Sequence, residues 1–262
     1  MVQLYSPAQP NAAELGVRRL PHLSVMRRVI LLPGMDGTGA LFRRFVSVAP
    51  AGYAPVVVSL PMEPLTRSAL AERLGAELDI GPDCVLVAES YSGALAVRLA
   101  AEHRVAGLVL CNSFVAPPRH PVLRLLAIPA FFRLSPPRAV IRYFLVGPAA
   151  GDDLVNEVAS VIARVPPHVF TARLTEVMTE EVGAWMLRCS GPVLYLRGTE
   201  DRLIPEASME RIHALCRAEM VSIPGPHFLL QAAPDAAWAA IDRFVTERAA
   251  AEPVVAADAG PQ

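Results

Sequence analysis

Short apolar runs alternate with segments in which apolar residues recur at helical spacing along the first part of the chain. The apolar runs of strand length span residues 29–32, 56–58, 84–89 and 107–111. The segments with helical spacing span residues 41–48, 66–78 and 94–101. Continuous apolar strands that alternate with helices indicate a parallel sheet with helices on both faces. We therefore predict an α/β fold with a mostly parallel, open sheet.

This alternation stops after Asn112 and returns near residue 186. Between 114 and 185 no run of strand length is present, and nine prolines separate short helix-like pieces. We interpret this stretch as an inserted helical cap. The elements expected after the cap are a strand at 193–196, a helix at 206–216, a strand at 219–223 and a closing helix at 235–248.

The pattern divides the 262 residues into four parts, and a chain of this length can form one large domain. The predicted parts are an N-terminal arm at 1–27, an α/β core at 28–113 and 186–248, a cap at 114–185 and a disordered tail at 249–262. A composition of 53% hydrophobic and 19% charged residues indicates a folded globular protein.

Charge excludes several classes of protein. The formal net charge of -1 gives no electrostatic reason to expect nucleic acid or an anionic membrane as a partner. All 24 basic residues are arginines, which excludes a lysine Schiff base and a P-loop lysine.

The longest apolar stretch, 122–134, is short and interrupted, so we expect no stable membrane insertion. The oligomeric state does not follow from the sequence.

The four cysteines stand singly, with no metal-ligand spacing among them. They are Cys84, Cys111, Cys189 and Cys216. Buried free thiols suit a reducing compartment, and residues 1–10 lack the features of a signal peptide. We therefore expect a cytoplasmic protein without a bound metal.

Ser90 lies where an apolar strand breaks and a helix begins. Ala88 lies two residues before it, and Ser92 and Gly93 follow two and three residues after it. Small residues at these places let strand and helix approach closely around a strained turn that exposes the serine hydroxyl. The usual pattern is G-x-S-x-G, and here other small residues replace both glycines. We predict that Ser90 is a nucleophile.

A nucleophilic serine needs a base, a group that orients the base, and donors for the oxyanion. Such groups converge at the carboxyl ends of parallel strands. His227 follows the last predicted strand, and Asp201 follows the strand before it. We predict that His227 is the base and that Asp201 orients it, with Glu200 as the rival of Asp201. The predicted oxyanion donors are the backbone N–H groups of Met35 and Tyr91.

These segments together resemble enzymes of the α/β-hydrolase fold over roughly residues 25–248. The matching segments are LLPGMDGTG at 31–39, AESYSG at 88–93, GTED at 198–201 with Pro205, and GPHF at 225–228. The chain order Ser90, Asp201, His227 is the order of the triad in that fold. The resemblance implies a mostly parallel sheet, a cap after the sixth strand of the family, and no cofactor.

The chain departs from the family pattern at three other points. Pro33 replaces the histidine that often precedes Gly34. The first two strands of the family are not evident in residues 1–27. Some members carry the acid after the preceding strand, but Asn112 and Ser113 offer no carboxylate there.

We therefore predict a serine hydrolase that cleaves a small-molecule carboxylic ester through an acyl-enzyme on Ser90. A fairly apolar acyl or alcohol part would suit the apolar side chains of the cap. The candidates for such a pocket are Leu125, Leu126, Ile128, Phe131, Phe132, Phe144 and Leu145. The same side chains could instead only pack the cap onto the core.

Two alternatives remain open. An acyltransferase or a thioesterase would use the same triad and the same acyl-enzyme, and the loop at 33–39 resembles that of plant plastid phytyl-ester-forming acyltransferases. The other alternative is a catalytically silent binding protein of this fold. Such proteins often lose a triad member, whereas this chain has all three.

Overall fold

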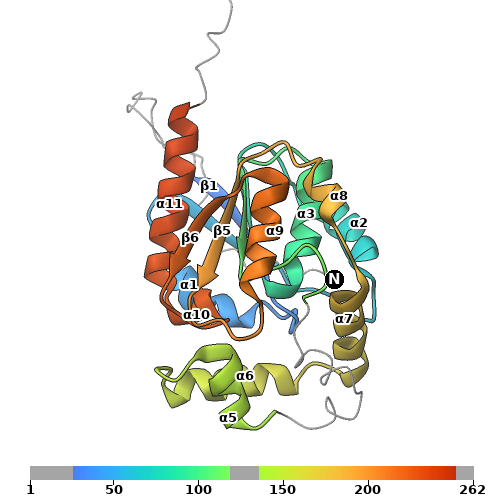
Figure 1. The fold of residues 1–262 in the computed structure, drawn as a ribbon, viewed down its shortest axis with the longest axis vertical. Coiled ribbons are helices and arrows are strands. Elements are labelled where there is room, and N and C mark those ends of the chain that lie inside the picture. The colour runs from blue at the N-terminus through green and yellow to red at the C-terminus, as the bar shows by residue number, and fades with distance from the viewer. Residues whose placement is uncertain (1–25, 119–135, 252–262) are drawn as a thin grey trace, which may run out of the picture.

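The computed structural model describes residues 26–118 and 136–251, and a six-stranded sheet lies at the centre of this part of the chain (Figure 1). Every neighbouring pair of strands is parallel, and the strand order is β2-β1-β3-β4-β5-β6. The strands are β1 (Arg27–Leu32), β2 (Tyr53–Val57), β3 (Cys84–Glu89), β4 (Gly107–Cys111), β5 (Val193–Gly198) and β6 (Glu219–Ile223). The predicted fold class is therefore confirmed.

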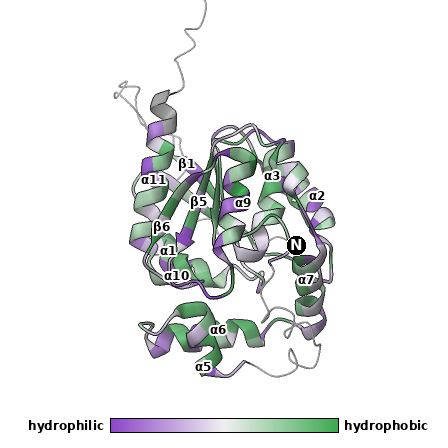
Figure 2. Cartoon of the chain, viewed as in Figure 1, coloured by the Kyte–Doolittle hydropathy of each residue, from purple (hydrophilic) through white to green (hydrophobic). Residues whose placement is uncertain are grey.

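Successive side chains of each strand face opposite layers of helices, which form two hydrophobic cores. The first layer consists of α1 (Arg43–Ser47), α10 (Leu229–Ala232) and α11 (Pro234–Ala251). The second consists of α2 (Arg67–Glu77), α3 (Gly93–Glu102), α8 (Gly183–Met186) and α9 (Glu206–Cys216). In β1, Val29 and Leu31 pack with the first layer, whereas Ile30 and Leu32 pack with the second. Figure 2 shows that the strands between these layers are mainly hydrophobic.

Helices also lie across the edge of the sheet where the strands end (Figure 1). In the described residues between β4 and β5 the chain forms helices and no strand. Four elements, called the inserted helices below, lie at this edge. They are α5 (Arg138–Ile141), the π-helical turn η4 (Arg142–Val146), α6 (Asp152–Ala163) and α7 (Pro167–Thr179). The division of the chain into a core and a separate cap stays a prediction.

Most predicted elements agree with the observed ones, and the differences have simple causes. β2 begins at Tyr53, before the predicted strand at 56–58, and it contains Pro55. Proline is tolerated there because β2 is the edge strand of the sheet. α11 reaches Ala251, so the first three residues of the expected tail are helical. Residues 1–25 and 252–262, with the rest of the expected arm and tail, lie outside the described residues.

None of the helices in residues 26–118 and 136–251 has the length and apolar character that crossing a membrane requires. Many of the expected pocket residues of the cap, at 125–132, also lie outside this part of the chain.

Candidate active site

Ser90 occupies a strained turn between β3 and the short 3-10 helix η2 (Ser90–Ser92). Its φ is 51°, in the left-handed region that residues with a side chain rarely adopt. The turn is tightly packed, because a Cβ at Gly93 would lie 1.7 Å from the Ser113 Oγ. The buried Ser92 hydroxyl donates a hydrogen bond to the Pro33 carbonyl. The small residues around Ser90 are therefore required by the close approach of the chain.

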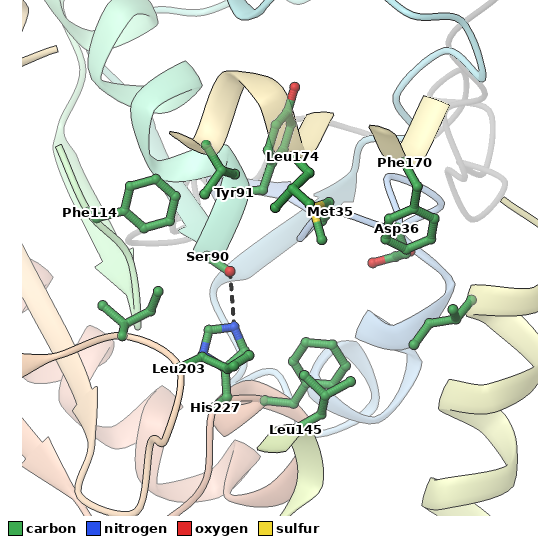
Figure 3. Close-up of a pocket in the computed structure, with 14 residues that line it drawn as sticks. Met35, Asp36, Ser90, Tyr91, Phe114, Leu145, Phe170, Leu174, Leu203 and His227 are labelled. Atoms are coloured by element: carbon green, nitrogen blue, oxygen red, sulfur yellow. Dashed lines mark hydrogen bonds between the residues drawn. The ribbon is translucent and has the colours of Figure 1, made fainter. Parts of the chain in front are cut away.

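His227 lies within hydrogen-bond distance of both other side chains of the predicted triad, Ser90 and Asp201. His227 Nε2 lies 3.0 Å from Ser90 Oγ (Figure 3), and His227 Nδ1 lies 3.0 Å from Asp201 Oδ2. The other oxygen, Asp201 Oδ1, accepts hydrogen bonds from the N–H groups of Leu203 at 2.8 Å and Ile204 at 3.1 Å. The carboxylate is thus fixed by its own loop, and one oxygen remains for the imidazole.

The electrostatics of this pair agree with an ionised Asp201. Burial raises the pKa of Asp201, but His227 and the backbone N–H groups outweigh that effect and hold the pKa below its usual value. Burial lowers the pKa of His227, but the Asp201 carboxylate outweighs it and holds the pKa above its usual value. Glu200, the rival of Asp201 in the sequence, is exposed. The geometry therefore favours Asp201 as the partner of His227.

Asn112 is a buried side chain at this site to which sequence reasoning gave no role. Its Nδ2 donates to the carbonyls of Pro226 at 3.0 Å and His227 at 2.7 Å. Its Oδ1 accepts a hydrogen bond from the Gly198 N–H at 2.8 Å. The side chain thus joins the end of β4 to the end of β5 and to the histidine loop. Its φ of 44° is one that asparagine tolerates well, and an asparagine directly after a strand was the available signal.

The loop after β1 lies beside Ser90 and contains the predicted donor Met35 (Figure 3). The Gly37 N–H donates to the Gly34 carbonyl at 3.0 Å. Because a trans peptide places its C=O and N–H on opposite sides, the Met35 N–H points away from this turn. The Tyr91 N–H belongs to the first turn of η2, where N–H groups have no partner within the helix. Neither predicted donor is therefore used by a hydrogen bond within its own turn, and their role as oxyanion donors stays a prediction.

An apolar pocket of about 100 Å³ opens at Ser90 and His227. Its walls include Phe114, Phe170, Leu174, Val177, Leu203 and Phe228 (Figure 3). Of the expected cap residues, Leu145 lines the pocket, and Phe144 is not among the lining residues. The pocket would favour an uncharged, apolar group next to the serine.

Two buried carboxyl groups lie close to Met35, and one of them, Asp36, belongs to the same loop and also lines the pocket. Glu89 is fully buried, and its Oε2 accepts a hydrogen bond from Gln231 Nε2 at 3.1 Å. Burial raises the pKa of Glu89 to about 7, and it also raises the pKa of Asp36. A Cβ at Gly34 would lie 3.8 Å from Asp36 Oδ2 and 3.9 Å from Glu89 Oε2, so both carboxyls flank the same peptide. Neither group contacts Ser90 through a hydrogen bond in the described structure.

The described residues contain no group of three His, Cys, Asp or Glu side chains that could hold a metal ion. The side chains at the site offer a hydroxyl, an imidazole and a carboxylate, and the loop and η2 add the two predicted backbone donors. Such a set can transfer a proton from a serine to a histidine and stabilise a negatively charged oxygen.

Comparisons with known proteins agree with this architecture. The profile of the alpha/beta hydrolase family matches residues 29–241, so the chain belongs to that family. No curated protein sequence matches the chain.

Several solved structures are similar to the chain in fold. An esterase from Thermogutta terrifontis is 20% identical, with a TM-score of 0.71 over 84% of this chain and 90% of that one. A bromoperoxidase from Bacillus anthracis is 17% identical, with a TM-score of 0.71 over 84% and 92%. An enol-lactonase from Burkholderia xenovorans LB400 is 15% identical, with a TM-score of 0.67 over 94% and 96%. At these identities the likeness shows a shared fold, and the chemistry must be argued from the site.

Proposed function

We propose that the protein is a serine hydrolase that cleaves carboxylic esters with a fairly apolar acyl or alcohol part. The observation that supports this most directly is the hydrogen-bonded row of Ser90, His227 and Asp201 at the edge of an apolar pocket. The family supports a hydrolase, and the finer assignment to carboxylic esters is proposed from the residues of the site.

Acylation begins when Ser90 Oγ attacks the ester carbonyl carbon. A C–O bond forms while the serine proton passes to His227 Nε2, and the carbonyl electron pair moves to oxygen. The N–H groups of Met35 and Tyr91 donate to that oxyanion. The tetrahedral intermediate then collapses, the bond to the alcohol oxygen breaks, and His227 returns its proton to the leaving alcohol. Asp201 stabilises the imidazolium and holds its tautomer.

Deacylation repeats these steps with water in place of the serine. Water gives a proton to His227 and attacks the acyl carbon, and the bond to Ser90 Oγ breaks as His227 returns the proton to the serine. The products are a carboxylic acid and an alcohol, and the enzyme is unchanged. No cofactor enters this sequence of steps.

The test is covalent labelling with a fluorophosphonate, which reacts with activated serines. We expect one adduct on the wild-type protein, mapped to Ser90 and absent from Ser90→Ala and His227→Ala. His168→Ala is a matched control, because His168 is an exposed histidine of α7. An unlabelled but folded wild-type protein would contradict the proposal and favour a silent binding protein.

Acyl transfer and thioester hydrolysis use the same acyl-enzyme. In the structure Asp36 Oδ1 accepts from the N–H and the hydroxyl of Thr38, at 2.9 Å and 2.6 Å. These bonds explain the Asp-Gly-Thr pattern of the loop as a turn, so the pattern gives no argument for a particular acyl acceptor. Product analysis with water, alcohols and thiols in competition distinguishes the three reactions.

A further inference from the structure

The backbone of the loop beside Ser90 is held at five successive carbonyl groups. The Ser92 hydroxyl holds the Pro33 carbonyl, and the Gly37 N–H holds that of Gly34. The carbonyl of Gly37 accepts a hydrogen bond from the Leu60 N–H at 2.7 Å. Two carbonyls remain in the middle of the loop, those of residues 35 and 36. A single side chain from a distant part of the sequence holds both.

That side chain is Arg173, in the middle of α7. Its Nη1 donates to the carbonyls of Met35 and Asp36, both at 2.9 Å, and its Nη2 donates to the carbonyl of Pro61 at 2.8 Å. The residue is 1% exposed, so these carbonyls take the place of water around Nη1 and Nη2, while the buried Nε has no hydrogen-bond partner in the described structure. The guanidinium therefore links an inserted helix directly to the loop that carries a predicted oxyanion donor.

Burying the Arg173 guanidinium to make this link costs free energy that a purely stabilising role would not explain. Burying a guanidinium costs free energy unless a carboxylate pairs with it, and Arg173 forms no ion pair with the described residues. Burial accordingly lowers the pKa of Arg173, with Tyr91 and Asp36 partly opposing that effect. The buried Arg67 differs in this respect, because its Nη1 pairs with Glu180 at 2.9 Å.

The loop is also shaped to leave room for this guanidinium. Gly37 has a φ of 71°, and a Cβ at that position would lie 2.3 Å from Arg173 Nη1. A side chain at residue 37 would therefore push the guanidinium away from the two carbonyls. The absence of a side chain at Gly37 thus leaves the space that the Arg173 guanidinium occupies beside the loop.

The position of Arg173 in α7 connects it to the pocket as well. Phe170, Leu174 and Val177 line the pocket, and their spacing of four and three residues places them on one face of the helix. Arg173 lies between them, three residues after Phe170 and four before Val177. The same helix therefore supplies a wall of the pocket and the support of the loop.

We propose that Arg173 is a positioning residue that holds the loop of Met35 in the shape required for oxyanion binding. It acts through the backbone of Met35 and Asp36 and does not touch the substrate. The proposal rests on the proposed function, because it assigns the Met35 N–H to a developing oxyanion. α7 thus supplies both the support of the oxyanion donor and a wall of the apolar pocket.

The test compares Arg173→Met, Arg173→Lys and the control Arg98→Met. Arg98 also pairs with Glu180, but it lies on α3 and forms no hydrogen bond with the loop of Met35 in the described part of the chain. With a p-nitrophenyl ester we expect kcat of Arg173→Met to fall about 10- to 100-fold while KM changes little, because misplaced donors weaken transition-state binding. Arg173→Lys should recover part of this loss, and Arg98→Met should keep the wild-type kcat.

A trifluoromethyl ketone inhibitor gives a second readout, because its adduct with Ser90 carries an oxyanion. Its inhibition constant should rise in Arg173→Met by about the factor by which kcat falls. Lower thermal stability with unchanged kcat and inhibition constant would overturn the proposal and leave Arg173 a purely structural residue. If Arg173→Met does not fold, Arg173→Lys decides, since it keeps the charge but has a single nitrogen in place of the two that hold the three carbonyls.

Hydrogen exchange of the Gly37 amide separates this proposal from the proposed function. That amide is hydrogen-bonded to the Gly34 carbonyl, so its exchange rate reports the shape of the loop. Faster exchange in Arg173→Met than in Arg98→Met supports positioning by Arg173 even if the wild-type protein hydrolyses no ester. Equal exchange in both variants overturns the proposal, whatever the activity.

Discussion

The Phe228 N–H donates to the Leu145 carbonyl at 2.8 Å, and this bond joins the histidine loop to the inserted helices. Leu145 also lines the pocket, and Phe228 follows His227 directly. The Arg202 guanidinium, next to Asp201, donates to the Tyr143 carbonyl at 3.0 Å in the same π-helical turn. The turn that closes one side of the pocket therefore also contacts the loops of the base and the acid.

Asp201→Asn should reduce kcat about 10³- to 10⁴-fold on a p-nitrophenyl ester, because the amide no longer stabilises the imidazolium or its tautomer. The neighbouring exposed Glu200 is the control, and Glu200→Gln should leave kcat unchanged. The measurement is steady-state kinetics of both variants at one pH. A large loss in Glu200→Gln with little loss in Asp201→Asn would reverse the assignment of the acid.

The rate of ester hydrolysis should rise with pH, with a midpoint above the ordinary imidazole pKa of about 6.5. The base must be neutral to accept the serine proton, and the Asp201 carboxylate holds the pKa of His227 above its usual value despite burial. The pH dependence of kcat/KM gives this midpoint in the free enzyme. A midpoint at or below the ordinary value would mean that burial, and not the carboxylate, controls His227.

Glu89→Gln should change how stability depends on pH. Burial raises the pKa of Glu89 from 4.5 to about 7, so the folded state holds this proton more tightly than the unfolded state. The stabilisation is fully present below about pH 4.5 and is lost as the pH rises to about 7, which amounts to about 3 kcal/mol. Glu89→Gln should therefore lose less stability over this range than the wild type. Chemical denaturation at several pH values measures the difference.

The control for that experiment is Glu72→Gln, which changes an exposed carboxyl of α2. It should follow the wild-type pH dependence throughout. If Glu89→Gln and the wild type lose the same stability between pH 4.5 and 7, Glu89 titrates as an ordinary carboxyl and its burial has no energetic consequence.

Leu174→Ala should shift the preference of the enzyme toward longer acyl or alcohol groups. The pocket has a volume of about 100 Å³, well below the roughly 300–1,000 Å³ of sites for drug-sized ligands. Removing a wall side chain enlarges it, so kcat/KM for p-nitrophenyl hexanoate relative to acetate should increase. Leu78→Ala, a buried leucine outside the pocket, controls for lost stability. Equal ratios in both variants would place the variable part of the substrate elsewhere.

The fold and the meeting of the triad side chains could be predicted because their signals are local. β4, α9 and β6 match the predicted ranges, since each is a continuous apolar or amphipathic segment bounded by clear turns. Ser90, Asp201 and His227 each follow a strand, and parallel strands bring their carboxyl ends together. The topology brings the three residues to one edge, and the loops that follow the strands set the observed distances of 3.0 Å. Their roles in catalysis stay proposals until activity is measured.

The supporting residues could not be predicted in the same way. Arg173 lies 138 residues from Met35 along the chain, and nothing near either residue indicates that they meet. Asn112 was noted in the sequence for lacking a carboxylate, while its contacts with Pro226 and His227 depend on how β4 and the last loop pack. Such contacts are consequences of tertiary packing, which a local pattern does not contain.

Because α7 supplies both a wall of the pocket and Arg173, substitutions in this helix can change selectivity and turnover together. Positions 170, 174 and 177 face the pocket, so a mutant library at these three sites should explore new selectivity. Substitutions that rotate or shift the helix would also move Arg173 and reduce turnover for every substrate alike. Screens that score one preferred ester by rate alone would discard such variants without revealing their altered selectivity. Recording product ratios beside turnover would keep the two effects apart.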